Sequence, residues 1–369
     1  MRLPLIILML CLFVCLPPLN VEAEEEPFTV SAEAAVLVET ETGRVLWEKD
    51  AYSEKRIASI TKIMTALVAI EEGDLDDSVE ISSHAEGTEG SSLYLQTGEK
   101  VKLEDLLYGL MLRSGNDSAV AIAEHVGGSV DGFVYLMNEK ANELGLENTV
   151  FANPHGLDDH ENHYSSAYDM AMIMQAAMER EEFRTISGTK MHRAPNENED
   201  WERVWRNKNR LLTERYEYAT GGKTGYTDRA KRTLVTSAQK ENMDLIAVTL
   251  NAPSDWDDHV RMFEYGFDTY QMHRLIDAGD LERGDDERYE GYEVRRSAMY
   301  PLTEEEYARV LPEVKWAGDE ALPFAGHLQF QLDNRVISEQ PVYREEIEKT
   351  TEDLSFWERL KDRFRQMME

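Results

Sequence analysis

Residues 56–71 read RIASITKIMTALVAIE and place Ser59 and Lys62 inside an otherwise apolar helical pattern. The apolar side chains recur at helical spacing and leave little polar face: Ile60, Ile63, Met64, Leu67, Val68 and Ile70. The stretch predicts a mostly buried helix with the serine and the lysine on one face. The lysine either extends its amine to the surface or is buried so that it can take the proton of the serine hydroxyl. One Ser-x-x-Lys motif does not decide between the two.

Two further short motifs follow in the chain. The stretch LRSGNDSA contains Ser114-Gly115-Asn116 at the join of two predicted helices, and GGKTGYTD contains Lys223-Thr224-Gly225 just before a predicted strand. Ser-x-x-Lys, Ser-x-Asn and Lys-Thr-Gly in this order are the three-part pattern of penicillin-recognising serine enzymes. The added motifs give Lys62 a polar pocket and a second cation, which favours the chemical role of this lysine.

The chain resembles the D-alanyl-D-alanine carboxypeptidases, which are low-molecular-mass penicillin-binding proteins, from about Ala32 to Tyr270. Stretches outside the motifs also look like this family, among them EGSSLYLQTGEKVKLEDLLYGLML, NTVFANPHGLDD and HYSSAYDMA. The resemblance implies a β-lactamase/transpeptidase-like α+β fold. It also implies a serine enzyme without a cofactor or metal that removes the terminal D-alanine from peptidoglycan stem pentapeptides, with β-lactam antibiotics as covalent inhibitors.

The resemblance implies four catalytic residues. Ser59 attacks the carbonyl between the last two D-alanines, and Lys62 takes the serine proton. Ser114 passes a proton toward the leaving amine, and Asn116 holds the substrate amide and the lysine. Water then hydrolyses the acyl-enzyme on Ser59.

It also implies a substrate-binding strand. Lys223 supplies positive charge near the terminal carboxylate of the substrate and keeps the pKa of Lys62 low, and Thr224 hydrogen-bonds that carboxylate. The backbone N–H groups of Ser59 and Tyr226 form an oxyanion hole. We interpret Gly225 as space for substrate backbone beside the strand.

Two positions depart from the family pattern. Position 226 is Tyr where well-known relatives carry His, which leaves the backbone donor in place. Relatives often bind the terminal carboxylate with an arginine after the following strands, where this chain reads NAPSDWDDHVRMF, with acids at that place. Arg261 in this stretch is therefore not assigned to the site.

Residues 1–23 predict a signal peptide, because Arg2 precedes a short apolar run and Val21-Glu22-Ala23 forms a small-x-small cleavage site. Both cysteines lie inside this segment, so the remainder excludes disulfides, thiolate metal sites and cysteine nucleophiles. We expect an exported protein at the outer face of the cytoplasmic membrane or in the cell wall. The formal net charge of −33 predicts a surface that repels nucleic acid, so we expect no nucleic-acid partner; the charge fits a well-solvated surface, or adaptation to high salt or high pH.

The 369 residues predict more than one domain. Residues 24–273 form the expected catalytic domain, with a strand hairpin at 35–39 and 45–48 and two strand runs within 232–251. Helical patterns occupy the rest: 103–112, 118–126, 130–145, 165–180 and 259–271. Strands at both ends and helices between them predict an α+β domain whose N- and C-terminal strands share one sheet.

The pattern of residue types along the chain changes near Leu275. Short alternating runs and turn residues predict a small β-rich domain over 274–348. Residues 349–369 predict an amphipathic helix with apolar side chains on one side and basic ones mainly elsewhere. Such a helix binds a membrane surface, or it docks on its own protein.

Four other functions compete with a carboxypeptidase. A D,D-endopeptidase cutting peptidoglycan cross-links uses the same residues. A serine β-lactamase needs a deacylating carboxylate, and no Glu-x-x-Leu-Asn motif lies between Asn116 and Lys223. The cluster HGLDDHENH at 155–163 allows a metal enzyme, although it also fits a polar loop before a helix. A non-catalytic wall-binding protein is the last alternative.

Overall fold

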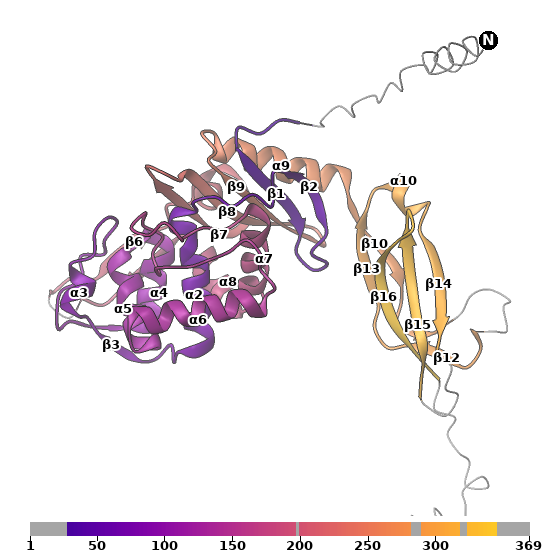
Figure 1. Ribbon diagram of the computed structural model, residues 1–369, viewed down its shortest axis with the longest axis horizontal. Helices are drawn as coiled ribbons and strands as arrows, with labels where there is room; N and C mark the ends of the chain where they lie inside the picture. The colour runs from indigo at the N-terminus through magenta and orange to yellow at the C-terminus, as the bar shows by residue number, and fades with distance from the viewer. Residues whose placement is uncertain (1–27, 197–198, 282–288, 318–322, 345–369) are drawn as a thin grey trace, which may run out of the picture.

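The computed structural model describes residues 28–196, 199–281, 289–317 and 323–344. It consists of a larger body of helices around one sheet and a smaller body made mainly of strands (Figure 1). The predicted signal peptide and the predicted C-terminal amphipathic helix lie outside the described residues. Within the described residues, no helix combines the length and the apolar character that crossing a membrane requires.

The larger body is built on a five-stranded antiparallel sheet in the order β2-β1-β9-β8-β7. Its strands are β1 (Ala34–Glu39), β2 (Val45–Lys49), β7 (Ala219–Thr227), β8 (Lys231–Lys240) and β9 (Met243–Leu250). The predicted hairpin and the predicted strand pair are confirmed, and β1 pairs with β9, so strands from both ends of the domain share one sheet. The predicted α+β class is therefore confirmed.

The sheet packs on both faces because side chains alternate along each strand. In β1, Val36 and Val38 face the large core of the helical region, whereas Leu37 faces a second core under α9 (Asp255–Thr269). The helix α9 begins four residues before the predicted start at 259 and ends at Thr269, two residues before the predicted end. Every residue of β1 is buried, as expected for a strand covered on both faces.

The helical region covers the other face of the sheet (Figure 1). Its main helices are α2 (Lys62–Glu72), α4 (Leu103–Tyr108), α5 (Asn116–Gly127), α6 (Val130–Glu143), α7 (Ala167–Met178) and α8 (Glu181–Gly188). Shorter elements join them: η1 (Ala58–Thr61), α3 (Ser83–Glu86), η2 (Gly109–Arg113), η3 (Leu211–Arg215), and the two-stranded pairs β3 (Ser78–Glu80) with β4 (Lys100–Lys102) and β5 (Met191–Ala194) with β6 (Arg203–Arg206).

Three local predictions need correction. Ser59 lies in η1, a 3₁₀ turn, and the α-helix begins only at Lys62. The predicted helix 103–112 changes after Tyr108 into the wider π turn η2. The Lys-Thr-Gly motif lies inside strand β7, and not just before a strand. Sequence periodicity identified the neighbouring helices and strands but does not report the tighter or wider turns that terminate them.

The smaller body holds a second five-stranded sheet in the order β11-β12-β16-β15-β14. Its strands are β11 (Gly279–Asp280), β12 (Tyr292–Val294), β14 (Leu311–Trp316), β15 (Phe324–Leu332) and β16 (Arg335–Arg344). A separate pair, β10 (Gln271–Ile276) with β13 (Ala298–Leu302), and the short helix α10 (Glu304–Tyr307) lie beside it. Arg44 of the larger body reaches this region, where it donates to the Pro301 carbonyl and pairs with Glu306 at 2.5 Å.

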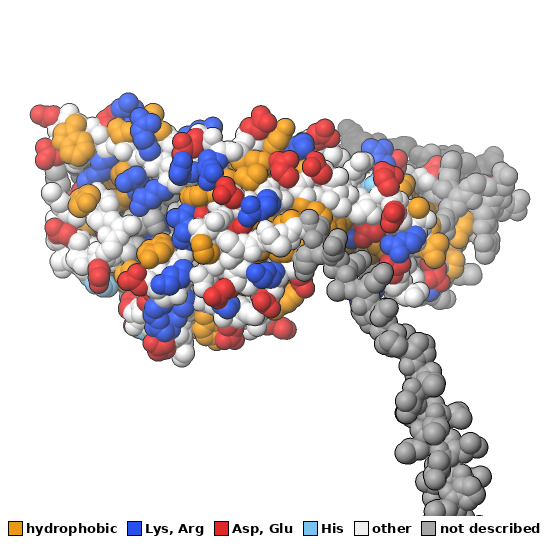
Figure 2. Space-filling model, turned by 90° about the horizontal axis from the view of Figure 1, so that it is seen from above, with side chains coloured by type: hydrophobic (Ala, Val, Ile, Leu, Met, Phe, Trp, Pro, Cys, Tyr) orange, Lys and Arg blue, Asp and Glu red, His pale blue; other side chains and the backbone are white. Residues whose placement is uncertain are grey.

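The surface mixes charges of both signs. Seen from above, Lys and Arg side chains lie between Asp and Glu side chains and scattered apolar groups (Figure 2). Although the net charge is −33, the face seen in this view is not uniformly acidic. Such an interspersed surface agrees with the interpretation that the charge mainly keeps the protein solvated.

Candidate active site

The first motif places a hydroxyl against a buried amine. In a 3₁₀ turn the side chains at positions i and i+3 eclipse one another, and Ser59 and Lys62 stand in this relation at the junction of η1 and α2. Lys62 Nζ lies 3.1 Å from Ser59 Oγ. The lysine side chain is 0% exposed, so it does not extend to the surface as the alternative interpretation required.

Three groups surround the Lys62 amine. Besides Ser59 Oγ, it lies 2.8 Å from Asn116 Oδ1 and 2.6 Å from the backbone carbonyl oxygen of His155. The amide oxygen and the carbonyl only accept hydrogen bonds, whereas a serine hydroxyl can also donate. A charged amine donates to all three groups, whereas a neutral amine would donate to the two acceptors and keep its lone pair for the Ser59 O–H. The geometry fits a lysine that acts as a base.

Burial is the largest cause that moves the pKa of Lys62 well below the usual lysine value. The positive charges of Lys223 and Lys208 lower it further, while Asp117 opposes them. Each cause acts on the charged form, because an ammonium group loses hydration when buried and is repelled by neighbouring cations. The amine therefore loses its proton far more readily than an exposed lysine does.

The second motif, Ser114-Gly115-Asn116, is positioned by a left-handed backbone turn and by contacts with the loop that contains Glu89 and Leu93. Ser114 adopts a left-handed conformation with φ 65° at the end of η2, which turns the chain before α5 begins at Asn116. Asn116 Nδ2 donates to the Glu89 carbonyl at 2.7 Å, which fixes the side-chain amide with its oxygen toward Lys62. The buried Asp117 accepts from the backbone N–H of Leu93 and so ties the same loop to α5.

The third motif brings a second buried amine to the site. Lys223 is 2% exposed, and its Nζ lies 3.1 Å from Ser114 Oγ and 2.7 Å from the Thr224 carbonyl. Burial first, and then the charge of Lys208, lower the pKa of Lys223 to about 7. The structure therefore joins the three predicted motifs through Lys62, Asn116, Ser114 and Lys223, although more than 100 positions separate Ser114 from Lys223 in the chain.

Strand β7 lies directly against the turn that carries the serine. A Cβ atom added to Gly225 would lie 2.4 Å from Thr233 Oγ1 and 3.0 Å from the Ser59 backbone nitrogen. Thr233 itself donates to the Ile57 carbonyl at 2.9 Å. Gly225 is thus required by the close approach of β7 and β8 to η1, which corrects the interpretation that this glycine makes room for substrate backbone.

Thr224 and Tyr226 lie on the same strand at an accessible edge. β7 is the last strand of its sheet, and so its outer edge has no strand partner among the described residues. Thr224 is half-buried, and Tyr226 is 60% exposed with its hydroxyl 3.3 Å from Asp228 Oδ1. Such an edge can pair with an extended peptide.

Two further contributors to the site lie outside the three motifs and were not predicted from the sequence. Lys208 follows β6, and its Nζ lies 3.5 Å from Ser91 Oγ, on the loop next to Asn116. No motif marked it, because its importance comes only from its position near the two buried lysines. The second contributor is the His155 carbonyl, and a backbone group leaves no signal in residue identity.

The histidine-rich stretch serves the packing around η1. His163 is buried, with Nε2 2.8 Å from Thr61 Oγ1 and Nδ1 accepting from the Ala152 backbone N–H. Both ring nitrogens are therefore used within the protein. No group of three or more His, Cys, Asp or Glu side chains in the described part of the chain is placed to hold a metal ion. Arg261 pairs with the buried Asp258 at 2.5 Å, on α9.

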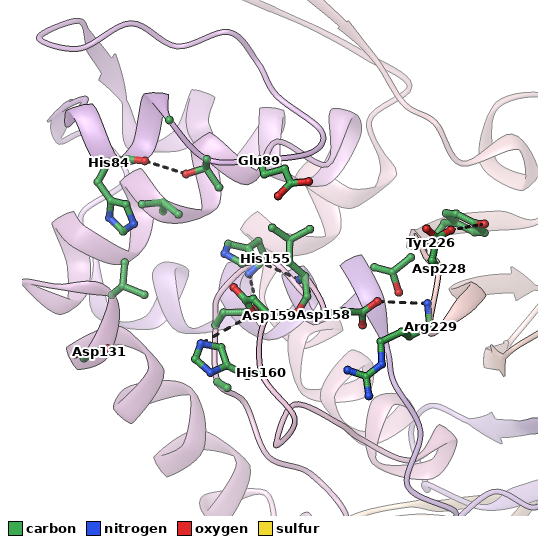
Figure 3. Close-up of a pocket in the computed structure, with 18 residues that line it drawn as sticks. His84, Glu89, Asp131, His155, Asp158, Asp159, His160, Tyr226, Asp228 and Arg229 are labelled. Atoms are coloured by element: carbon green, nitrogen blue, oxygen red, sulfur yellow. Dashed lines mark hydrogen bonds and ion pairs between the residues drawn. The ribbon is translucent and has the colours of Figure 1, made fainter.

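A cavity of about 920 Å³ opens beside the motifs. Figure 3 shows its walls, with His155 and the loop acids near the centre and Tyr226, Asp228 and Arg229 on the far side. Three segments of this wall also contact or carry the motif residues. The Glu89 carbonyl accepts from Asn116, the His155 carbonyl accepts from Lys62, and Tyr226 follows Gly225. A ligand in the cavity therefore lies close to the residues of the three motifs.

Comparisons with known proteins agree with this site. The model of the D-alanyl-D-alanine carboxypeptidase family matches residues 20–254. The chain is similar to D-alanyl-D-alanine carboxypeptidase DacF of Bacillus subtilis, with 36% identity over 348 residues that make up 89% of this chain and 88% of the relative. It is also similar to DacA of Haemophilus influenzae, with 34% identity over 72% of this chain and 71% of that one.

Solved structures show the same fold. Penicillin binding protein 5 from Haemophilus influenzae matches with a TM-score of 0.73 and 28% identity over 87% of this chain and 98% of that chain. A Streptomyces K15 DD-transpeptidase matches with a TM-score of 0.62 and 32% identity, and it covers 65% of this chain but 99% of its own. Because the family model spans most of this chain and the Bacillus relative is similar over nearly its whole length, the chain belongs to the D-alanyl-D-alanine carboxypeptidase family.

Proposed function

We propose that the chain works as a serine D,D-carboxypeptidase with Ser59 as nucleophile and neutral Lys62 as its base. The observation that carries this assignment is the set of partners around Lys62 Nζ, two obligate acceptors and one hydroxyl. A neutral amine in this setting accepts the Ser59 proton as the oxygen attacks a carbonyl carbon. The product is an ester on Ser59, with the free amino acid as leaving group.

The substrate is a peptidoglycan stem peptide that ends in D-Ala-D-Ala. Its terminal carboxylate would meet Lys223 and the Thr224 hydroxyl, with Lys208 adding positive charge. These lysines supply the charge that the missing family arginine would otherwise supply. Positive charge gathered in a chain of net charge −33 favours an anionic group at this point.

The transition state would be stabilised by backbone donors. The N–H groups of Ser59 and Tyr226 would bind the oxyanion, and the close contact of Gly225 with Ser59 N keeps these two segments together. Ser114 Oγ, 3.1 Å from Lys223 Nζ, would pass a proton to the leaving amine. Asn116 would bind a substrate amide with its remaining hydrogen-bonding capacity while it holds Lys62.

Deacylation distinguishes this function from that of a serine β-lactamase. The chain between Asn116 and Lys223 carries no Glu-x-x-Leu-Asn motif, so rapid hydrolysis of penicillin is not expected. The family acts on D-Ala-D-Ala peptides, and its penicillin-binding members form adducts with β-lactams. We therefore expect a long-lived penicilloyl adduct on Ser59. Endopeptidase cleavage of cross-links would use the same residues and is the second candidate.

We also propose a division of the chain into four segments. Residues 24–273 would carry catalysis, in keeping with a DD-transpeptidase whose nearly complete chain matches only 65% of this one. Residues 274–348 would form the small β-rich domain. Residues 1–23 would direct export, and residues 349–369 would bind the outer face of the cytoplasmic membrane.

Labelling with fluorescent penicillin, followed by a D-alanine release assay on a pentapeptide, tests the assignment. Wild type should label and release D-alanine, whereas Ser59→Ala and Lys62→Ala should do neither. Mass spectrometry should place the adduct on Ser59. Full hydrolysis by Ser59→Ala would overturn the proposed nucleophile. Faster cleavage of a cross-linked dimer than of a pentapeptide would favour the endopeptidase.

A further inference from the structure

A buried ion pair joins the hairpin of β5 and β6 to the loop that precedes β4. Arg203, the first residue of β6, pairs with Glu99, and their side chains are 7% and 0% exposed. The second carboxylate oxygen of Glu99 accepts from the Gln96 backbone N–H at 3.1 Å. Taking two charges out of water is costly, and apolar side chains of similar volume often give equal or greater stability. The stability of the fold therefore does not by itself explain this pair.

The loop on the Glu99 side holds Asn116 of the second motif. The Glu89 carbonyl accepts from Asn116 Nδ2 at 2.7 Å, and the Ser91 carbonyl accepts from the Asn116 backbone N–H, also at 2.7 Å. The same asparagine presents its Oδ1 to Lys62 Nζ. The position of this loop therefore sets where the amide of Asn116 lies relative to the lysine.

The hairpin on the Arg203 side supports the turn that carries Ser114. Strand β6 packs against η2, which ends directly before Ser114. Just after the strand, the Lys208 backbone N–H donates to the Leu112 carbonyl of η2 at 3.1 Å. The ion pair thus spans the two segments that flank the second motif. A guanidinium group is planar and directs its N–H groups rigidly, so this contact fixes a direction and a distance that an apolar contact leaves loose.

We infer that Arg203 and Glu99 are positioning residues that hold the Ser114-Gly115-Asn116 motif at the place where it serves Lys62. The inference rests on the proposed carboxypeptidase function. The pair acts through the loop carbonyls on Asn116 and through β6 on the turn before Ser114. A displacement of about 1 Å at a catalytic group can lower a rate about 100-fold, so a small movement of the loop is enough to matter.

The double variant Arg203→Met/Glu99→Met separates positioning from stability. Two methionines fill similar space without charge, so the protein should fold with a urea midpoint close to that of wild type. The kcat for D-alanine release from a pentapeptide should nevertheless fall about tenfold, and the rate constant for penicillin acylation should fall by a similar factor. KM should change less than about threefold, because Lys223 and Thr224, which would bind the terminal carboxylate, lie on β7.

Two single variants show whether the direction of the contact matters. Arg203→Met leaves Glu99 buried without its cation, and both the urea midpoint and kcat should fall. Arg203→Lys keeps the charge without the planar fork and should recover only part of kcat. A purely structural role predicts instead that kcat follows the urea midpoint in all three variants, which would overturn the inference.

The matched control is an exposed ion pair on the same hairpin. Arg193 and Glu202 lie 3.2 Å apart with side chains 60% and 61% exposed, and Arg193→Met/Glu202→Met should keep the wild-type kcat. A wild-type kcat in the buried double variant, an equal loss in the control, or a buried double variant that does not fold would each overturn the inference. Penicillin labelling of Ser59 in wild type would still support the proposed function. A wild type that neither hydrolyses the pentapeptide nor labels would overturn both.

Discussion

Lys62 Nζ lies 2.6 Å from the backbone carbonyl oxygen of His155, a residue 93 positions further along the chain. This contact ties the start of α2 to the loop before α7 and gives the amine an acceptor that no side-chain substitution removes. Together with Asn116 Oδ1 it occupies both N–H groups of a neutral lysine. A neutral amine would then keep its lone pair for the hydroxyl of Ser59, 3.1 Å away, as the proposed transfer of the serine proton requires.

The rate of Ser59 acylation should depend on pH in a bell shape. The pKa of Lys62 is lowered far below its usual value, so the rate rises with pH as this lysine becomes neutral. Lys223 has a pKa of about 7 and must be charged to bind the carboxylate, so the rate falls above this value. The second-order rate constant for penicillin acylation, measured over the whole pH range in which the protein stays folded, gives both limbs. A flat profile would contradict the assigned protonation states.

Lys208→Gln should move this profile to higher pH. The charge of Lys208 lowers the pKa values of both Lys62 and Lys223, and its removal lets both rise. We expect an upward displacement of about half a pH unit and a three- to tenfold lower kcat/KM for peptides, mainly through KM. Lys190→Gln removes an equal charge from an exposed site and should leave the profile in place. Identical profiles for both variants would show that Lys208 does not act on the site.

Gly225→Ala should reduce kcat about 100-fold with little loss of folded protein. The added methyl group would meet Thr233 Oγ1 and the Ser59 backbone nitrogen, so either β7 or η1 must move and the oxyanion donors separate. Loss of one such donor raises the barrier by about 3 kcal/mol. Peptide hydrolysis gives kcat, and circular dichroism checks the fold. A Gly225→Ala enzyme as fast as wild type would refute the close-contact argument.

The free energy of unfolding should rise between pH 7 and pH 10. Folding lowers the pKa of Lys223 from 10.5 to about 7, so over this interval the unfolded chain binds more protons than the folded one. Stability therefore increases with pH as the unfolded lysine approaches its own pKa, by an amount on the order of 3 kcal/mol. Urea denaturation at several pH values measures this slope. Lys223→Met should have a clearly smaller slope, and an unchanged slope would show that Lys223 is not the group responsible.

The sequence by itself determined the chemical groups and the fold class. Ser59, Lys62, Ser114, Asn116 and Lys223 form motifs whose residue types allow one main kind of catalysis, and the structure brings all five together. The strand hairpin, the strand pair and the helices were readable because side-chain periodicity reflects burial on one or both faces. The order of the elements then restricted the sheet to strands from both ends of the domain.

Only the tertiary structure decided how these groups act. The His155 carbonyl is invisible in residue identity, and the influence of Lys208 depends on distance and burial, which a one-dimensional pattern does not contain. The role of Gly225 changed from substrate space to chain contact, since the space beside it is filled by η1. Packing also excluded the alternative in which Lys62 extends its amine to the surface, because the side chain is fully buried. Local sequence sets the donors and acceptors, whereas the low-dielectric environment that alters their pKa values arises only when distant segments enclose them.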